Sequence, residues 1–396
     1  LHYPLRRQRQ MCIRDSQWTA PDGTAKQAWL VDYKDAAGKR RAKQFARKKE
    51  AEAYSDQAKQ EVRQGRHTHD RDSITVALAA DLWINAGEAE GLERSTLKRY
   101  RELARVHIVP KFGALKLSAL TKTQVQEWRQ ELLLSQSRSM ASKIIRALSA
   151  ILSNAMDIGA IAQNVAAGVK VGRLKREAEK IVPPDRADLK KLIKAASDTE
   201  RPLVLTAITT GLRSSELRGL RWHDIDLDAG TVTVCQRADQ WGEIGPPKSE
   251  AGRRTIPIPP ELVAELKRWK LRCKPSKLDL AFPSATGTPL RHNNLLRRMY
   301  FPLQVKAGLG VPKLNKQGKP QVDEEGEPIL TGKYGFHALR HAAASSWIES
   351  RIDLKRLQVW IGHENIQLTL DTYGHLLADQ ERDAELALKA SRDLFG

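Results

Sequence analysis

The sequence predicts a multidomain protein that is mainly α-helical, with a small α+β domain near the N-terminus and a small β-hairpin inside a mixed, mostly helical last domain. Three observations predict this fold class. The chain has 396 residues, which is enough for two or three domains of about 100–200 residues each. Apolar residues recur at helical spacing through most of the chain, whereas strand-like alternation is confined to short stretches. A polar linker over 173–184 ends in two prolines and separates two regions.

The composition indicates a strongly basic protein. Lys and Arg number 67 against 47 Asp and Glu, which gives a formal net charge of +20. Nucleic acid is the commonest partner of such a surplus, because neutralised phosphates release condensed counterions, and a basic but inert surface is the alternative. No window approaches about 18 uninterrupted apolar residues, which excludes a conventional membrane-spanning helix. Three scattered cysteines exclude a disulfide scaffold and a four-cysteine zinc site, so we expect a soluble protein of the cytoplasm.

Residues 17–66 are predicted to form the small α+β domain. Trp29, Val31 and Tyr33 alternate as in a half-buried strand, and turn-forming residues lie on both sides of them. From 48 to 64 the pattern becomes helical and polar. The basic stretch before this helix either docks on DNA or is a solvated basic face. Its members are Lys39, Arg40, Arg41 and Lys43.

Residues 1–16 differ from the rest of the N-terminal region. They combine clustered arginine with no helical or strand period, and they lack the apolar stretch of about 7–15 residues that a signal peptide needs. The chain begins with Leu1 rather than Met. We therefore expect 1–16 to be a non-native or disordered prefix and assign it no function.

Residues 73–172 are predicted to form a four-helix unit with short connections. Ser73 is expected to cap the first helix and Gly87 to end it, while Pro110 is expected to stop the second helix. The four helices are predicted over 73–86, 95–109, 121–134 and 137–158. Positive charge lies on the exposed side of the second helix, at Lys98, Arg99, Arg101 and Arg105.

Residues 185–396 are predicted to form the last domain. Asp185 can cap its first helix, and strand-like stretches over 231–235 and 254–258 predict a hairpin. Residues 308–334 are rich in Gly, Lys, Pro and acidic residues, and they predict an excursion or hairpin inserted between helices.

Two short stretches of the last domain present cations at defined positions. In the first, Gly211 ends a helix and Arg213 begins the next, where Arg213 and Glu216 share a face. A guanidinium held by a carboxylate suits phosphate binding, and an ordinary surface ion pair is the alternative. In the second, Lys248 occupies the tip of the predicted hairpin, where it either protonates a leaving oxygen or is a solvated turn lysine.

Two further stretches carry histidines and a tyrosine. His337, Arg340 and His341 share one helical face, and the two histidines have a spacing that can bind zinc. The glutamate of the metalloprotease motif is missing, since Ala338 stands there, and Arg340 repels a cation, so we predict no metal. His363 follows, and then Tyr373, which taken alone fits the core or the surface.

In this order the four stretches resemble the signature of the tyrosine recombinase family, the phage-integrase-type site-specific recombinases. That family has an Arg in a TGLRxSEL-like box, a hairpin Lys, an H-x-L-R-H box, a GH box and a nucleophilic Tyr. The matching catalytic positions are Arg213, Lys248, His337, Arg340, His363 and Tyr373, with Glu216 in a supporting place. The resemblance spans roughly 73–380, and residues 17–66 more weakly resemble an arm-binding domain.

The resemblance implies a fold of the tyrosine recombinase type, with arm-type DNA-binding, core DNA-binding and catalytic domains. It implies an enzyme that cleaves and rejoins double-stranded DNA at attachment sites through a 3′-phosphotyrosine on Tyr373, with no cofactor and no metal. The arginines and histidines would stabilise the transition-state charge, nearby cations would favour the phenolate, and Lys248 would protonate the departing 5′-oxygen.

The family further implies how the protein assembles. Four protomers would act on two DNA sites, with DNA-bending accessory proteins, at the bacterial nucleoid. The C-terminal segment 379–395 either packs on a neighbouring subunit or closes its own core.

Two alternatives differ in activity. A type IB topoisomerase uses the same tyrosine chemistry but relaxes DNA without choosing sites, and a catalytically inactive relic would only bind DNA. The helical unit over 73–172 and the basic region over 17–66 favour a site-specific integrase of a prophage or mobile element. The intact set of six catalytic positions argues against a relic.

Overall fold

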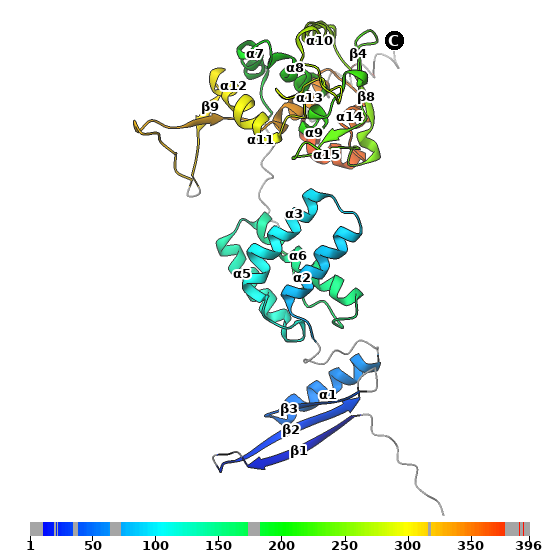
Figure 1. Ribbon diagram of the computed structural model, residues 1–396, viewed down its shortest axis with the longest axis vertical. Coiled ribbons are helices and arrows are strands. Elements are labelled where there is room, and N and C mark those ends of the chain that lie inside the picture. The colour runs from blue at the N-terminus through cyan, green and yellow to red at the C-terminus, as the bar shows by residue number, and fades with distance from the viewer. Residues whose placement is uncertain are drawn as a thin grey trace, which may run out of the picture. The chain divides into compact units, whose positions relative to one another are not determined.

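The chain divides into two compact units, Leu1–Lys175 and Arg176–Gly396 (Figure 1). The computed structural model describes residues 11–19, 21, 23–34, 39–63, 73–172, 183–315 and 318–376, together with 388 and 391. Within these residues the chain is mostly helical with small sheets, so the predicted fold class is confirmed. None of the described helices is both long enough and apolar enough to cross a membrane.

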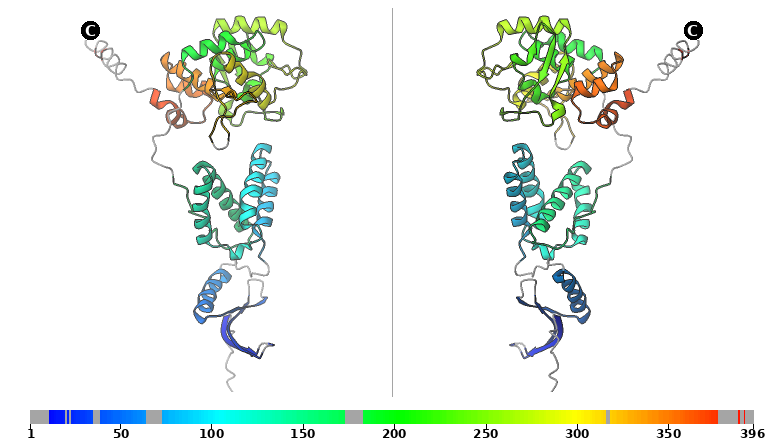
Figure 2. Two further views of the ribbon diagram at one scale, coloured as in Figure 1. Left: turned by 90° about the vertical axis from the view of Figure 1, so that its left-hand side faces the viewer. Right: turned by 90° about the vertical axis from the view of Figure 1, so that its right-hand side faces the viewer.

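A three-stranded antiparallel sheet with one helix against its face forms the first part of the N-terminal unit (Figures 1 and 2). Its elements are β1 (Met11–Thr19), β2 (Ala25–Lys34), β3 (Arg40–Phe45) and α1 (Lys48–Arg63), with β2 in the centre of the sheet. Val31 and Tyr33 of β2 are buried together with Ala51 of α1. The strand and helix predicted here are confirmed.

The prediction that residues 1–16 stand outside the fold is wrong for 11–16. They belong to β1, which pairs with β2 from Met11 opposite Tyr33 onward. Ile13 packs against the buried side chains of β2. Most other residues of β1 are polar, so the period-two pattern is weak in the sequence, whereas strand pairing uses only the backbone N–H and C=O groups. Residues 1–10 lie outside the described residues.

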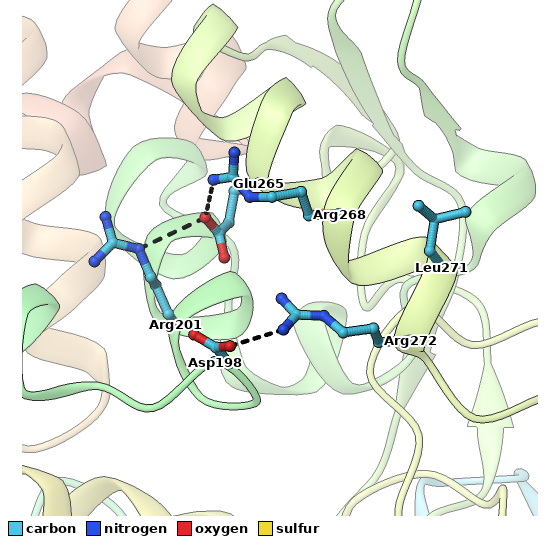
Figure 3. Close-up of a pocket in the computed structure, with 6 residues that line it drawn as sticks. All are labelled: Asp198, Arg201, Glu265, Arg268, Leu271 and Arg272. Carbon is cyan, nitrogen blue, oxygen red and sulfur yellow. Dashed lines mark hydrogen bonds and ion pairs between the residues drawn. The ribbon is translucent and has the colours of Figure 1, made fainter.

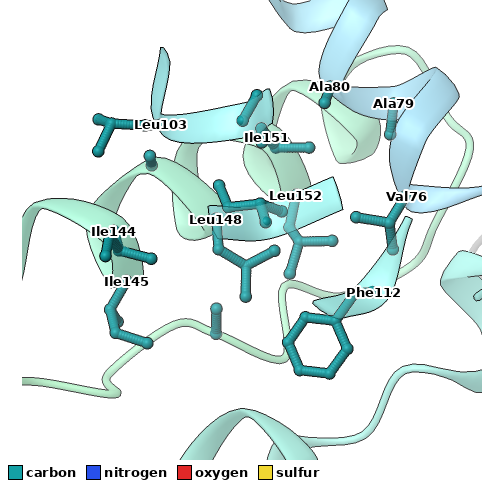
Figure 4. Close-up of a cluster of buried hydrophobic side chains, with 14 of the residues drawn as sticks. Val76, Ala79, Ala80, Leu103, Phe112, Ile144, Ile145, Leu148, Ile151 and Leu152 are labelled. Atoms are coloured by element: carbon teal, nitrogen blue, oxygen red, sulfur yellow. The ribbon is translucent and has the colours of Figure 1, made fainter. Parts of the chain in front are cut away.

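Helices surround a core of apolar side chains over residues 73–172 (Figure 4). The helices are α2 (Val76–Ala89), α3 (Arg94–Leu103), α4 (Val109–Phe112), α5 (Lys122–Ser135) and α6 (Arg138–Asp157), with a π-helical turn over Ala104–Ile108. Ile144, Leu148 and Ile151 of α6 are 0% exposed. Thr121 and Ser137 accept hydrogen bonds from the first turns of α5 and α6, so those two helix starts are confirmed.

The predicted cap of the first helix is wrong by two residues. Thr75 caps α2, and its Oγ1 accepts the Leu78 N–H at 3.2 Å. The Ser73 hydroxyl instead accepts the Ser118 N–H at 3.1 Å. Both residues are good caps, and a contact between segments far apart in the sequence decides between them.

Two predicted helix ends are also wrong. Gly87 lies inside α2, where a Cβ atom would come within 2.9 Å of Leu92 Cδ1, so close packing explains the glycine. Pro110 does not stop the second helix, which continues through α4 to Phe112. Pro110 is the second residue of α4, directly after the wider π-helical turn, and a proline costs little in the first turn of a helix.

A small sheet surrounded by helices forms the unit Arg176–Gly396 (Figures 1 and 2). Strands β4 (Ile225–Asp226), β5 (Thr231–Val234) and β8 (Arg254–Pro257) are antiparallel in that order, which confirms the predicted hairpin. The connection from β5 to β8 carries a second short hairpin, β6 (Arg237–Ala238) with β7 (Ile244–Gly245).

Nine α-helices accompany this sheet in the described part of the unit. They are α7 (Arg186–Ala195), α8 (Arg201–Thr210), α9 (Ser214–Arg218), α10 (Pro260–Arg272), α11 (His292–Asn294), α12 (Phe301–Lys306), α13 (His337–Glu349), α14 (Leu354–Ile361) and α15 (Ile366–Tyr373). Asp185 caps α7 as predicted, since its Oδ1 accepts the Asp188 N–H at 2.7 Å.

The predicted insertion over 308–334 is a hairpin. Strand β9 (Gly310–Pro312) pairs with β10 (Leu330–Gly332) between α12 and α13, and the hairpin extends away from the helices of its unit (Figure 1). The segment 379–395, for which a subunit contact was considered, lies outside the described residues apart from 388 and 391.

Candidate active site

The turn between α8 and α9 places Arg213 beside Glu216. Gly211 ends α8 with a φ of +59°, a conformation that favours glycine, and Arg213 is the N-cap of α9. The Arg213 guanidinium donates to Glu216 Oε1 at 2.7 Å and to the Gly362 carbonyl at 2.9 Å. Because the Glu216 side chain is only 3% exposed, the pair is not the ordinary surface ion pair considered above.

Arg254 completes this ion cluster and was missed from the sequence. Its side chain is 1% exposed and donates to Glu216 Oε2 at 2.8 Å, to the Trp360 carbonyl at 2.7 Å and to the Gly252 carbonyl at 2.9 Å. The only signal in the sequence is the position of Arg254 two residues before Ile256 in β8. Alternate residues of a strand point to the same face, so Arg254 lies on the buried face with Ile256. Arg254 thereby joins the sheet to the last turn of α14.

The Glu216 carboxylate is ionised inside the protein. Burial by itself raises the pKa of Glu216, but Arg254 and then Arg213 outweigh burial and lower that pKa to about 2. Two guanidinium groups therefore share one buried carboxylate, which holds both of them in place. The cluster retains a net positive charge at neutral pH.

Arg340 is the most deeply buried of the predicted catalytic residues. It lies in the first turn of α13, is 2% exposed, and donates to the Gly211 carbonyl at 2.8 Å and to the Ile361 carbonyl. Burial and the neighbouring Arg213 lower the pKa of Arg340 to about 9, so the guanidinium stays protonated at neutral pH. Backbone carbonyls at the C-terminal ends of α8 and α14 thus orient this cation.

Gly362 allows these arginines to converge. It ends α14 with a φ of +67°, and a Cβ atom there would lie 2.9 Å from Arg254 Nη1 and 3.0 Å from the Ala251 carbonyl oxygen. A side chain has no room at this position. The carbonyls of residues 360–362 can therefore accept hydrogen bonds from three different arginines.

Tyr373 ends α15 with its side chain against two histidines. The residue is 3% exposed, and its hydroxyl lies 3.0 Å from His341 Nδ1. The ring of His363 stacks on the Tyr373 ring with 6.3 Å between centroids and 12° between planes, and His363 Nδ1 lies 3.0 Å from Thr369 Oγ1. Burial raises the pKa of Tyr373, and Arg340 and Arg213 oppose that rise without cancelling it. Arg340 and Arg213 therefore favour the phenolate, as expected, but desolvation has the larger effect on the pKa of Tyr373 in this arrangement.

His337 and Lys248 are more exposed than the other predicted catalytic residues. His337 begins α13 as an exposed residue, and its ring centroid is 4.8 Å from that of His341. Partial burial and then Arg340 lower the pKa of His337, which keeps its ring neutral. Lys248 is exposed on the β5–β8 connection, and Arg254, six residues later, anchors the end of that connection to Glu216.

The eight predicted DNA-binding residues lie in the N-terminal unit. Lys39, Arg40, Arg41 and Lys43 lie on or beside β3, where Arg40 pairs with Asp32 and Lys43 Nζ lies 4.6 Å from the centre of the Tyr54 ring. Lys98, Arg99, Arg101 and Arg105 are all exposed, as predicted, along α3 and the π-helical turn. Arg101 pairs with Glu88, and Lys98 lies 3.8 Å from Glu102.

A separate cavity of about 520 Å³ between α8 and α10 contains none of the predicted site residues (Figure 3). Its charged side chains pair with one another, since Glu265 contacts Arg201 and Arg268 while Asp198 contacts Arg272. In the described part of the chain, no group of three or more His, Cys, Asp or Glu residues is arranged to hold a metal ion.

Comparisons with known proteins point to one family. A family model described as "Phage integrase family" matches residues 185–380, and one described as "Phage integrase, N-terminal SAM-like domain" matches 78–133. The chain is 28% identical over 386 residues to a tyrosine recombinase XerC-like protein of Caldanaerobacter subterraneus subsp. tengcongensis, covering 91% of this chain and 94% of that protein. It is 25% identical over 337 residues to the prophage integrase IntR of Escherichia coli, covering 80% of each.

Two solved structures share the fold. The integrase of transposon Tn1549 in complex with transposon right end DNA matches with a TM-score of 0.62 and 22% identity, covering 80% of this chain and 100% of that chain. A lambda integrase dimer bound to a COC′ core site matches with a TM-score of 0.56 and 19% identity, covering 92% of this chain and 95% of that chain.

Proposed function

Because the chain belongs to the tyrosine recombinase family and is a site-specific DNA recombinase, we propose that Tyr373 is its nucleophile and that Arg213 and Arg340 bind the phosphate it attacks. The observation that carries this assignment is the convergence of α9, α13, α14 and α15. Glu216 and backbone carbonyls hold the guanidinium groups of Arg213 and Arg340 in place, and both groups interact electrostatically with Tyr373.

The chemistry follows from these residue types. A phosphodiester is anionic and resists attack, so the guanidinium groups of Arg213 and Arg340 offset the charge that develops in the transition state. His363 and His337 add imidazole groups at the same place, and Lys248 protonates the departing 5′-oxygen. The 3′-phosphotyrosine conserves the energy of the broken bond, so the DNA can be rejoined without a cofactor.

The remaining parts of the chain supply DNA contacts. We assign the exposed basic residues of α3, together with those of β3, to the phosphate backbone of double-stranded DNA. A lambda integrase tetramer bound to a Holliday junction shares the fold with a TM-score of 0.54, and we extend that assembly to four copies of this chain. Integration or excision of a prophage or mobile element, helped by DNA-bending proteins in the bacterial cytoplasm, is the proposed role.

Covalent capture tests the assignment. The protein is mixed with fragmented DNA of its source genome in EDTA, quenched with detergent, and the protein-linked DNA is sequenced, with Tyr373→Phe in parallel. We expect adducts from the unaltered protein alone, clustered at one locus. DNA binding by gel shift without any adduct would contradict the assignment.

The same experiment separates a recombinase from a topoisomerase-like enzyme. Adducts scattered over the genome, combined with relaxation of supercoiled plasmid, would indicate strand cleavage without site choice. Adducts clustered at one locus, with joined products only between that locus and its partner site, would indicate site-specific recombination.

A further inference from the structure

We propose that His341 is a further catalytic residue, which holds the Tyr373 hydroxyl in the free protein and accepts its proton when the phenol attacks phosphorus. This inference rests on the proposed role of Tyr373 as nucleophile. It identifies the group that accepts the proton of the Tyr373 hydroxyl. Among the described contacts, none of the other five residues of the family signature is hydrogen-bonded to that hydroxyl.

The contact joins two helices at the reacting atom. His341 lies on α13 and Tyr373 ends α15, with 3.0 Å between Nδ1 and the hydroxyl oxygen. The rings meet edge to face, with 5.6 Å between centroids and 61° between planes. A hydroxyl on a residue that is only 3% exposed needs a partner, and His341 provides it.

The charged groups around His341 favour a neutral ring that accepts a proton. On its own helix it faces Arg340 and His337, and from α15 it faces Tyr373. The His363 ring lies parallel to the Tyr373 ring, and Arg213 of the adjoining cluster also acts on the pKa of Tyr373. Partial burial and then Arg340 lower the pKa of His341, which favours the neutral ring. With the ring proton on Nε2, the lone pair of Nδ1 accepts the hydrogen bond from the Tyr373 hydroxyl.

The other two imidazoles of the site are engaged differently. His363 Nδ1 is bonded to Thr369 Oγ1, and its ring lies parallel to the Tyr373 ring rather than pointing at the hydroxyl. His337 stands with its ring perpendicular to that of His341, at the exposed edge of the site. Geometry therefore favours His341 as the group that receives the phenolic proton.

Every proton that is lost by one group in cleavage or rejoining is accepted by another. In cleavage, the bond from Tyr373 Oη to phosphorus forms and the bond from phosphorus to the 5′-oxygen breaks. The proton of Tyr373 passes to His341 Nδ1, while Lys248 donates a proton to the departing 5′-oxygen. In rejoining, the 5′-hydroxyl attacks phosphorus and returns a proton to Lys248, and the His341 imidazolium returns a proton to Tyr373 as the phosphotyrosine bond breaks.

The test measures single-turnover adduct formation by His341→Ala. The probe is a nicked synthetic duplex with the sequence recovered from adducts of the unaltered protein, used at saturating protein. We expect a rate about 100-fold lower, within the range for lost general-base catalysis, with unchanged DNA affinity. Added imidazole should restore part of the rate to His341→Ala and none to Tyr373→Phe. His223→Ala, which removes an exposed imidazole of the same unit, serves as the matched control and should react at the normal rate.

A second readout separates proton transfer from packing. Replacing Tyr373 alone with 3-fluorotyrosine makes the phenol more acidic, so the effect of His341→Ala should shrink. A full-size effect with fluorotyrosine and no imidazole rescue would overturn the proposal, as would an unchanged rate in His341→Ala. If the unaltered protein forms no adduct, the proposed function fails, and this inference fails with it.

Discussion

Two regions of the molecule hold their positive charge in opposite ways. In the active-site cluster, Arg340 and Arg254 are buried, and their N–H groups are bonded to carbonyls and to one carboxylate. On α3 and the π-helical turn after it, Arg99 and Arg105 are exposed, and Arg101 pairs with a carboxylate whose side chain is itself 45% exposed. Buried donors keep one geometry and can match a transition state, whereas exposed cations raise affinity for any phosphate backbone. The comparison predicts effects that differ in kind as well as in size.

Replacing a buried active-site guanidinium should have the largest effect on catalysis. Arg340→Lys keeps the charge but cannot donate from two nitrogens to the Gly211 and Ile361 carbonyls in the same plane. We expect adduct formation to slow by about 100- to 1,000-fold, as for the loss of one transition-state donor. Single-turnover assays measure the rate of adduct formation. The matched control is Arg272→Lys, because Arg272 forms an exposed ion pair with Asp198. Equal rates of adduct formation in the two variants would show that the buried Arg340 guanidinium matters no more for catalysis than an exposed arginine.

Breaking the buried ion cluster should have the largest effect on stability. Glu216→Gln leaves Arg254 buried without its carboxylate, and we expect a loss of about 3–5 kcal/mol in the free energy of unfolding. Asp198→Asn breaks an exposed pair and should cost at most about 1 kcal/mol. Urea unfolding followed by tryptophan fluorescence measures the unfolding free energy of both variants. An equal or smaller loss in Glu216→Gln than in Asp198→Asn would contradict this prediction.

The half-buried His363 should make stability depend on pH. Burial, and then Arg340, Arg213 and Arg254, lower the pKa of His363 from 6.5 to about 4 in the folded chain. Between those values the unfolded chain binds a proton that the folded chain does not, so stability is full above pH 6.5 and falls as the pH drops toward 4.

His363→Gln removes this titration. Over the same window we expect the unfolding free energy of the variant to fall less than that of the unaltered protein, by no more than about 3 kcal/mol. Urea midpoints at several pH values measure the difference. Parallel pH profiles would show that His363 titrates normally when folded.

Removing exposed cations should have the smallest and least specific effect. Arg99→Ala and Arg105→Ala should each weaken DNA binding for every sequence and lower the slope of log affinity against log salt by about 1. The cleavage rate of the bound complex should not change. A sequence-specific loss of binding would instead assign these residues to base contacts.

The sequence predicts well whatever depends on local pattern. The helix starts near Thr121 and Ser137 and the cap at Asp185 were predictable because a capping side chain and a following apolar period define them. The order of the catalytic residues was predictable from short motifs, although no motif indicates that they meet.

The remaining features depend on contacts between distant segments. Thr75 rather than Ser73 caps α2 because Ser73 bonds to Ser118. In the sequence Arg254 is an ordinary strand residue, and only the fold brings Glu216 and the Trp360 carbonyl within hydrogen-bond distance of it. His341 was visible on the face of a helix, but its contact with Tyr373 joins residues on two different helices. A single sequence does not show which distant residues become the partners of these side chains.

The central claim is that Tyr373 forms the bond to DNA, and locating the adduct tests it most directly. Covalent complex from the unaltered protein is trimmed with nuclease and cleaved with trypsin, and the peptide that carries a nucleotide is sequenced by mass spectrometry. We predict a nucleotide on the peptide 357–382, attached at Tyr373. A nucleotide on any other residue, or an adduct of unchanged yield in Tyr373→Phe, would contradict the account.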